Sequence, residues 1–165
     1  MIEQHNSKIT FGSVYQSEYC PDDQIIKEAN LLILPYKNFR DGVDYCFTEY
    51  GEEFLRYVKG RNLNEVKADI AITDDKYRVI EMHSLLIDIG IILLKEGIVS
   101  VAFGLLTNYV YDKIKALHTK EEDVNIRFEI ISQDASGKSK SIRYDGPASG
   151  FKDVKETAEK MIEQL

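Results

Sequence analysis

Several stretches of the chain show the pattern of hydrophobic and polar positions that predicts strands. In "VNIRFEII", residues 124–131, apolar side chains alternate with Asn, Arg and Glu, which is the period of a half-buried strand. Residues 8–17 alternate in a similar way, so we expect a strand there too. The all-apolar run "LLILP" at 31–35 is typical of a strand covered on both faces, and residues 36–44 read as a loop.

Two other stretches have the spacing of amphipathic helices. In residues 48–60, "TEYGEEFLRYVKG", Phe54, Leu55 and Val58 share one face before Gly60, a residue that often ends a helix. A turn containing Gly137 and a return strand at 141–147 precede the last helix, which we expect to begin at a Ser149 cap. Its apolar stripe consists of Phe151, Val154, Ala158, Met161 and Leu165.

The middle of the chain, residues 84–117, is the most hydrophobic segment. Ser84 is a suitable N-cap, and the longest stretch without a charge, residues 97–111, has 15 residues. Spanning a bilayer takes about 20 residues. We therefore expect a buried helix or helix pair, either continuous or broken at Gly97.

Residues 68–83, "ADIAITDDKYRVIEMH", read as two short strands joined by an acidic turn. If residues 74–76 form the turn, Asp69 faces Glu81 across the hairpin and His83 lies on the same side. A turn one residue shorter sends Glu81 to the other face. The turn has no glycine to select between these registers, so both stay open.

These elements together predict one α+β domain over residues 1–165. We expect a mixed, mainly antiparallel sheet of about six strands. The 84–117 helices and the C-terminal amphipathic helix would cover one side of it. A chain of 165 residues is long enough for one hydrophobic core.

Charge limits the partners that this domain can have. Its net charge of −7, from 28 acidic and 21 basic residues, disfavours nucleic-acid binding. The most basic segment, residues 137–143, reads as an edge strand that uses lysine to prevent edge pairing. Cys20 and Cys46 have no metal-binding or redox spacing. No secretory signal is visible at residues 1–12, so we expect a cytoplasmic protein. The shortness of the charge-free stretch at 97–111 disfavours a membrane as its partner.

Residues 48–95 resemble the core of the PD-(D/E)xK nuclease superfamily, in which carboxylates on a hairpin and on the preceding helix hold a divalent ion. The resemblance implies that Asp69 and Glu81 bind Mg²⁺, with a further carboxylate from Glu52 or Glu53.

Two positions depart from the nuclease pattern. Ala68 stands where the superfamily has proline, and His83 stands at its lysine position. A metal-dependent nuclease with Asp69, Glu81, His83 and Glu53 as catalytic residues is therefore our alternative function.

Residues 97–165 resemble effector-associated accessory domains of bacterial conflict and antiphage systems, in the order of a glycine-containing apolar helix, a strand, a "GKS" hairpin and a terminal helix. This resemblance implies a non-enzymatic adaptor. Our leading prediction is a protein-interaction or oligomerisation module without a cofactor, an accessory component of a bacterial defence system. Its partner would be another protein or a second copy.

The glycines of the apolar segment suggest where such a module would self-associate. Gly90, Gly97 and Gly104 recur every seven residues, so that they lie near one helix face. We expect an interface centred on Gly97, Phe103 and Gly104. A lesser alternative is a membrane-acting effector in which residues 85–111 rearrange.

Overall fold

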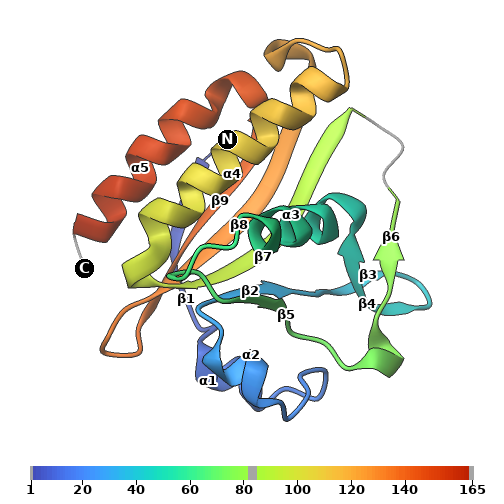
Figure 1. Cartoon of the computed structure of the whole chain (residues 1–165), viewed down its shortest axis with the longest axis vertical. Coiled ribbons are helices and arrows are strands. Elements are labelled where there is room, and N and C mark those ends of the chain that lie inside the picture. Colours follow the sequence, from blue (N-terminus) through green and yellow to red (C-terminus); the bar gives the residue numbers. More distant parts are fainter. Residues whose placement is uncertain (1, 82–84, 164–165) are drawn as a thin grey trace.

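A six-stranded mixed sheet lies at the centre of the computed structural model, which describes residues 2–81 and 85–163 (Figure 1). Its strand order is β1-β9-β8-β7-β2-β5, and a smaller sheet has the order β3-β4-β6. The strands are β1 (Ile2–Ser7), β2 (Leu31–Leu34), β3 (Tyr36–Arg40), β4 (Val43–Thr48), β5 (Ala68–Ile70), β6 (Val79–Ile80), β7 (Leu86–Lys95), β8 (Asn125–Gln133) and β9 (Ser139–Pro147).

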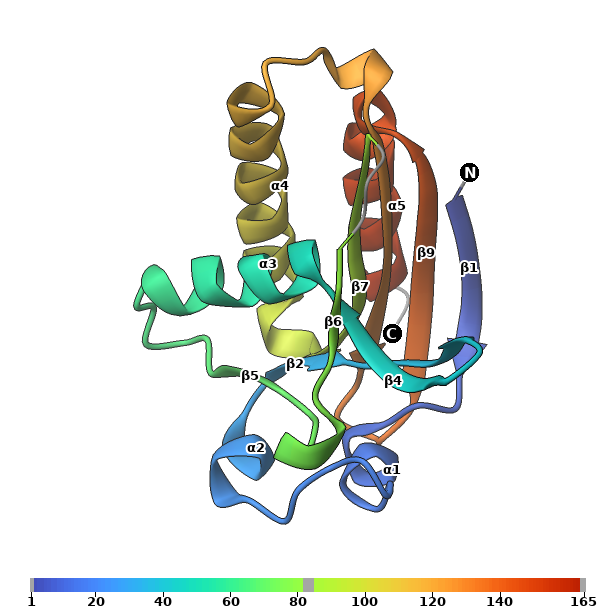
Figure 2. The ribbon, with the colours of Figure 1, turned by 90° about the vertical axis from the view of Figure 1, so that its right-hand side faces the viewer.

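The helices pack mainly against one face of the large sheet. They are α1 (Phe11–Tyr15), α2 (Gln24–Glu28), α3 (Glu49–Gly60), α4 (Val99–Ala116) and α5 (Phe151–Glu163), with 3₁₀ turns at Asp74–Lys76, Glu96–Ile98, Glu121–Asp123 and Ala148–Gly150. Helices α4 and α5 run along the sheet, and α1 and α2 lie at its lower end (Figure 2). No helix in the described stretches has the length and apolarity needed to cross a bilayer.

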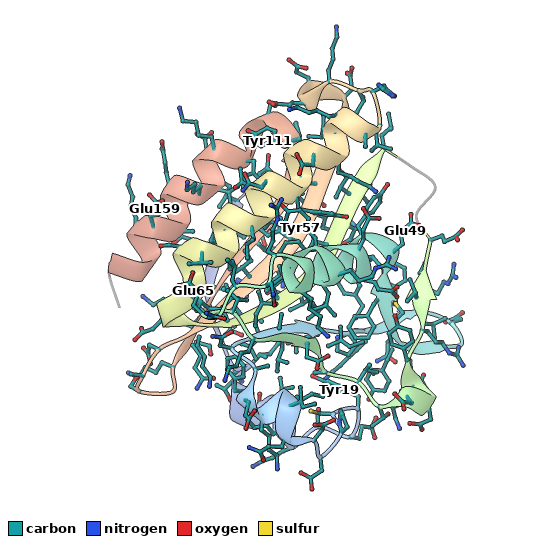
Figure 3. The ribbon with its side chains drawn as sticks, viewed as in Figure 1. Tyr19, Glu49, Tyr57, Glu65, Tyr111 and Glu159 are labelled. Atoms are coloured by element: carbon teal, nitrogen blue, oxygen red, sulfur yellow. The ribbon has the colours of Figure 1, made fainter. Side chains whose placement is uncertain are left out.

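Aromatic contacts join the helices to each other and to the sheet. Phe128 of β8 meets Phe151 of α5 with 5.8 Å between ring centroids. The ring of Tyr57 on α3, which is labelled in Figure 3, lies 5.5 Å from the ring of Tyr109 on α4. Phe54 contacts the same ring at 5.5 Å. One continuous core therefore lies between the helices and the large sheet.

The predicted α+β class, the six-stranded sheet and the C-terminal helix are confirmed. Residues 31–34 form a strand buried along its whole length, and β8 turns its alternate apolar residues inward. The predicted apolar faces of α3 and α5 are buried at Phe54, Leu55, Val58, Phe151, Val154 and Ala158. The Met161 side chain and Leu165, which complete the predicted stripe, lie outside the described residues.

The predicted helix or helix pair over 84–117 is wrong in its first part. Residues 86–95 form β7, which lies between β8 and β2, and only α4 is helical. A strand buried on both faces is apolar throughout, so its pattern does not differ from that of a buried helix. Gly97 lies in the 3₁₀ turn that leads into α4. Ser84, the predicted cap, lies outside the described residues.

The predicted hairpin over 68–83 does not form. Strand β5 pairs in parallel with β2, where Asp69 is opposite Leu32, and β6 pairs in parallel with β4. Asp69 is therefore opposite neither Glu81 nor Ile80. Each of these strands is three residues long or shorter, and each is stabilised by a longer strand from elsewhere in the chain.

Three further predictions of local structure are wrong. Within residues 8–17, a capping box between Thr10 and Ser13 starts α1 instead of a strand. Residues 36–44 are not a loop, because β3 and β4 form a hairpin around Asp41 and Gly42, whose φ is +79°. The basic segment 137–143 is not at an edge, since β9 lies between β1 and β8.

A β-bulge at Asp88–Gly90 fixes the start of α3 against β7. Thr48, the N-cap of α3, accepts a hydrogen bond from Gly51 N at 2.9 Å, and its hydroxyl donates to the Asp88 carbonyl oxygen. A Cβ added to Gly51 would lie 2.6 Å from the carbonyl oxygen of Ile89. Glycine at position 51 thus permits the close approach of helix and bulge.

We predict that Gly51→Ala lowers the free energy of unfolding by about 1 to 3 kcal/mol, because the methyl group overlaps backbone that cannot move aside easily. Gly104→Ala is the matched control, since a Cβ there meets no atom within 4 Å. Better helix propensity should make the control more stable by up to about 1 kcal/mol. Urea unfolding measures both, and equal stability of the two variants would contradict the close approach.

Candidate functional site

A cavity of about 530 Å³ lies between α1, the β2–β3 link and the strands β7, β8 and β9; we call it the Tyr36 cavity. This volume is within the usual range of small-molecule pockets, roughly 300 to 1,000 Å³. Its apolar walls include Ile9, Val14, Leu34, Pro35 and Ile91. Its larger polar side chains are Tyr19, Tyr36, Lys37, Arg127, Glu129 and Arg143.

A fully buried carboxylate, Asp88, lies directly behind two of the lining residues. The Tyr36 hydroxyl donates to Asp88 Oδ1 at 2.7 Å, and the Gly90 N–H donates to the same oxygen at 3.0 Å. Arg127 Nη1 lies 3.6 Å from Oδ2. Oδ2 accepts no hydrogen bond from any described residue. Asp88 therefore connects β3, β7 and β8 beside the cavity.

Burial changes the acidity of both partners in the Tyr36–Asp88 hydrogen bond. Desolvation raises the pKa of Asp88, while the hydrogen bond from Tyr36 and the charge of Arg127 act in the opposite direction. Burial and the neighbouring Asp88 charge raise the pKa of Tyr36. Tyr36 consequently stays a hydrogen-bond donor at neutral pH.

Two rows of alternating charge cross the sheet next to the cavity. In the first, Asp88, Arg127 and Asp145 are opposite one another on β7, β8 and β9, and Arg127 Nε lies 3.2 Å from Asp145 Oδ2. Cross-strand neighbours of opposite charge stabilise such a sheet face.

The second row consists of Glu129, Arg143 and Glu3 on β8, β9 and β1. Arg143 Nη2 lies 3.3 Å from Glu129 Oε2, and Arg143 Nη1 lies 3.8 Å from Glu3 Oε2. His5 Nε2 approaches the same Glu129 oxygen at 3.7 Å.

Each arginine in these rows has one inner and one outer carboxylate. The side chains of Asp88 and Glu129 are 0% and 13% exposed, whereas those of Asp145 and Glu3 are 54% and 51% exposed. Exposed ion pairs contribute little to stability, about 0 to 1 kcal/mol. Arg143 has its shorter ion pair with the inner Glu129, whereas Arg127 donates a hydrogen bond to the outer Asp145 and has a longer ion pair with the inner Asp88.

Lys37 is the third basic residue at the cavity. Its Nζ lies 5.3 Å from the ring centroid of Tyr19, which is labelled in Figure 3. Within the described parts of the chain, Lys37 forms no ion pair with a carboxylate. Its charge is thus available to a ligand.

The residues predicted for the nuclease site are not brought together. Asp69 lies on β5, 3.7 Å from Lys59 Nζ, and Glu53 binds Lys113 Nζ at 2.5 Å on the α3–α4 side. Glu81 follows β6 and is exposed, while His83 lies outside the described residues.

Glu52, the other helix carboxylate considered for that site, accepts a hydrogen bond from Tyr77. Among the side chains that the structure describes, no three of His, Cys, Asp or Glu are grouped so that they could hold a metal ion. The hairpin register that would place Asp69 opposite Glu81, one of the two that the sequence left open, does not occur, and Mg²⁺ binding stays a prediction.

The predicted interface residues do not share one surface. Gly97 is exposed, Gly104 is partly exposed, and Phe103 is buried in the chain's own core at 2% exposure. Phe103 is therefore not available to a partner in this conformation. Self-association itself stays a prediction.

Asp88, Tyr36 and the two arginines are site residues that the sequence pattern does not reveal. Asp88 gave a signal, because it is a lone acid inside an apolar run, and such a residue needs a partner. Arg127 was assigned to the polar face of its strand. Which residues lie opposite it depends on strand order, and the sequence pattern does not contain that information.

Comparison of the chain with known protein families, curated proteins and solved structures found no match.

We predict that Asp88→Asn is at least as stable as the native chain at pH 7. Because the folded-state pKa of Asp88 is raised, the folded chain holds this proton more tightly than the unfolded chain. The native free energy of unfolding therefore falls as pH rises from the ordinary pKa, near 3.8, through the raised one. Asparagine keeps an oxygen that accepts hydrogen bonds from Tyr36 and Gly90. Because asparagine does not ionise, the variant does not lose stability over this pH range.

Urea unfolding between pH 4 and pH 7 tests this prediction. The advantage of the Asp88→Asn variant should shrink as pH falls toward 4. Asp145→Asn, in the same charged row but exposed, is the matched control and should change stability by less than about 0.5 kcal/mol. A variant that becomes relatively less stable as pH rises would contradict the raised pKa.

Proposed function

We propose that this chain is a binding module that takes a small molecule into the Tyr36 cavity. The observation that carries the proposal is that an apolar-walled hollow of about 530 Å³ has several polar groups directed to it and a buried carboxylate beside it. Pockets of this kind are the preferred location of ligand sites. Ionisable groups with perturbed pKa values also concentrate at such sites.

The strands that carry the cavity walls support this proposal. Arg127, Glu129 and Arg143 lie on β8 and β9, and Ile91 lies on the central strand β7. Residues on central strands are held by ladders on both sides, so their side chains start from fixed backbone positions. A ligand would meet a largely preformed site.

Binding can be tested by titrating the ¹⁵N-labelled chain with a panel of neutral, cationic and anionic aromatic compounds and recording amide shifts. We expect some compounds to shift the amides of Lys37, Arg127 and Arg143. Ile91→Trp should fill the cavity and weaken binding of these compounds about tenfold or more. Ile25→Trp is the control, because Ile25 is 66% exposed and does not line the cavity.

The proposal fails if no compound shifts the cavity amides, or if Ile91→Trp binds as well as the native chain. Circular dichroism should first show that both tryptophan variants are folded. If Ile91→Trp is unfolded, Ser17→Tyr, at another residue that lines the cavity, gives the same test.

We keep self-association as a second proposal, as expected of an accessory interaction module. The open space beyond Gly104 on α4 supports it, since a Cβ there has no neighbour within 4 Å. Gly104→Leu should reduce any dimer seen by sedimentation velocity, with Gly104→Ala as the smaller control. A native chain that stays monomeric at high concentration would contradict it.

A further inference from the structure

We infer that the ligand of the Tyr36 cavity is an organic anion, a carboxylate or phosphate carried on a compact apolar body. This inference rests on the proposed function and adds the chemical class of the ligand. It follows from the charges that line the cavity and from how each of them is held.

The lining of the cavity has more basic than acidic side chains, although the chain as a whole is acidic. Three basic side chains, Lys37, Arg127 and Arg143, line it together with one acidic side chain, Glu129. The whole chain carries a net charge of −7. Three further carboxylates, those of Asp88, Asp145 and Glu3, pair with the two arginines. The groups that a ligand can use are therefore the Lys37 charge and the guanidinium N–H donors, and both favour an anion over a cation.

The two arginines can accept a ligand without losing their inner partners. Arg127 is held from inside by buried Asp88, and Arg143 by Glu129. Their other carboxylate partners are about half exposed, and exposed pairs are weak. Guanidinium has five N–H donors in a planar fork that matches carboxylate and phosphate oxygens. A bound oxyanion can therefore accept hydrogen bonds from a guanidinium group that keeps its ion pair with the inner carboxylate.

Lys37 supplies a charge that pairs with no carboxylate in the part of the chain that the structure describes. It lies at the start of β3, next to Tyr36, and its Nζ is above the Tyr19 ring. A ligand anion would satisfy it directly. The apolar walls, among them Val14, Leu34 and Ile91, fit the uncharged body of the same molecule.

A matched series of ligands tests the inference on the full chain. Phenylacetate, benzyl phosphate, benzylamine and benzyl alcohol share a phenyl ring and differ in charge. Amide-shift titrations at low salt would give each dissociation constant. We expect one or both anions to bind at least about tenfold more tightly than benzyl alcohol, and benzylamine to bind least well.

The two anions separate the possible oxyanion types. Tighter binding of phenylacetate indicates a carboxylate ligand, and tighter binding of benzyl phosphate indicates a phosphate ligand. Either result supports an organic anion. Raising the salt concentration should weaken binding of the anion and leave the affinity for benzyl alcohol unchanged.

Charge-changing variants show whether the basic side chains of the cavity are responsible for anion binding. Lys37→Gln should weaken binding of the anion about fivefold, because an exposed charge interaction is lost. Lys155→Gln, an exposed lysine of α5, removes the same charge at a site that does not line the cavity and should have no effect. Glu3→Gln removes an exposed carboxylate that competes with the ligand for Arg143. It should lower the dissociation constant of the anion about twofold.

The outcomes separate this inference from the proposed function. If benzyl alcohol or benzylamine enters the cavity as tightly as the anions, a small-molecule site exists and the anion inference is wrong. If Lys37→Gln and Lys155→Gln weaken the anion equally, the named cavity charge is not responsible and the inference also fails. If none of the four compounds shifts the cavity amides, both this inference and the proposed function are overturned for aromatic ligands of this size.

Discussion

The burial of Asp88 in the central strand is the constraint on which the rest of the structure depends. A carboxylate with no exposed surface needs partners, and these come from Tyr36, Gly90 and Arg127. These partners belong to three strands, β3, β7 and β8. Asp88 thereby connects the small sheet to the large one. The Tyr36 cavity lies where these two sheets meet.

The bulge in β7 explains how one residue can have this role. Gly90, at a φ of +91°, lets the backbone place its N–H on Asp88 Oδ1. On the other side of the bulge, Ile89 approaches Gly51 and the Asp88 carbonyl receives the Thr48 hydroxyl. The same irregularity therefore fixes α3 in the core and orients the carboxylate beside the cavity.

The sequence predicted the parts of the fold that have a clear hydrophobic period, such as β8, α3 and α5. It did not separate β7 from a helix, because Leu86–Lys95 is apolar almost throughout, although its many isoleucines favour a strand. The Asp41–Gly42 pair is a sequence signal for the β3–β4 hairpin, since Asp-Gly favours a tight turn. The cavity was not predictable, since the pairing of Asp88 with Arg127 depends on the parallel crossover through α4.

The most direct test of this account is the pH titration of the Asp88 carboxyl carbon by ¹³C NMR in the native chain and in Tyr36→Phe. The hydrogen bond from Tyr36 lowers the Asp88 pKa, while burial raises it more. The account predicts a native pKa above the ordinary aspartate value and a further rise when the hydroxyl is removed. A native pKa at or below the ordinary value, or one that Tyr36→Phe leaves unchanged, would contradict it.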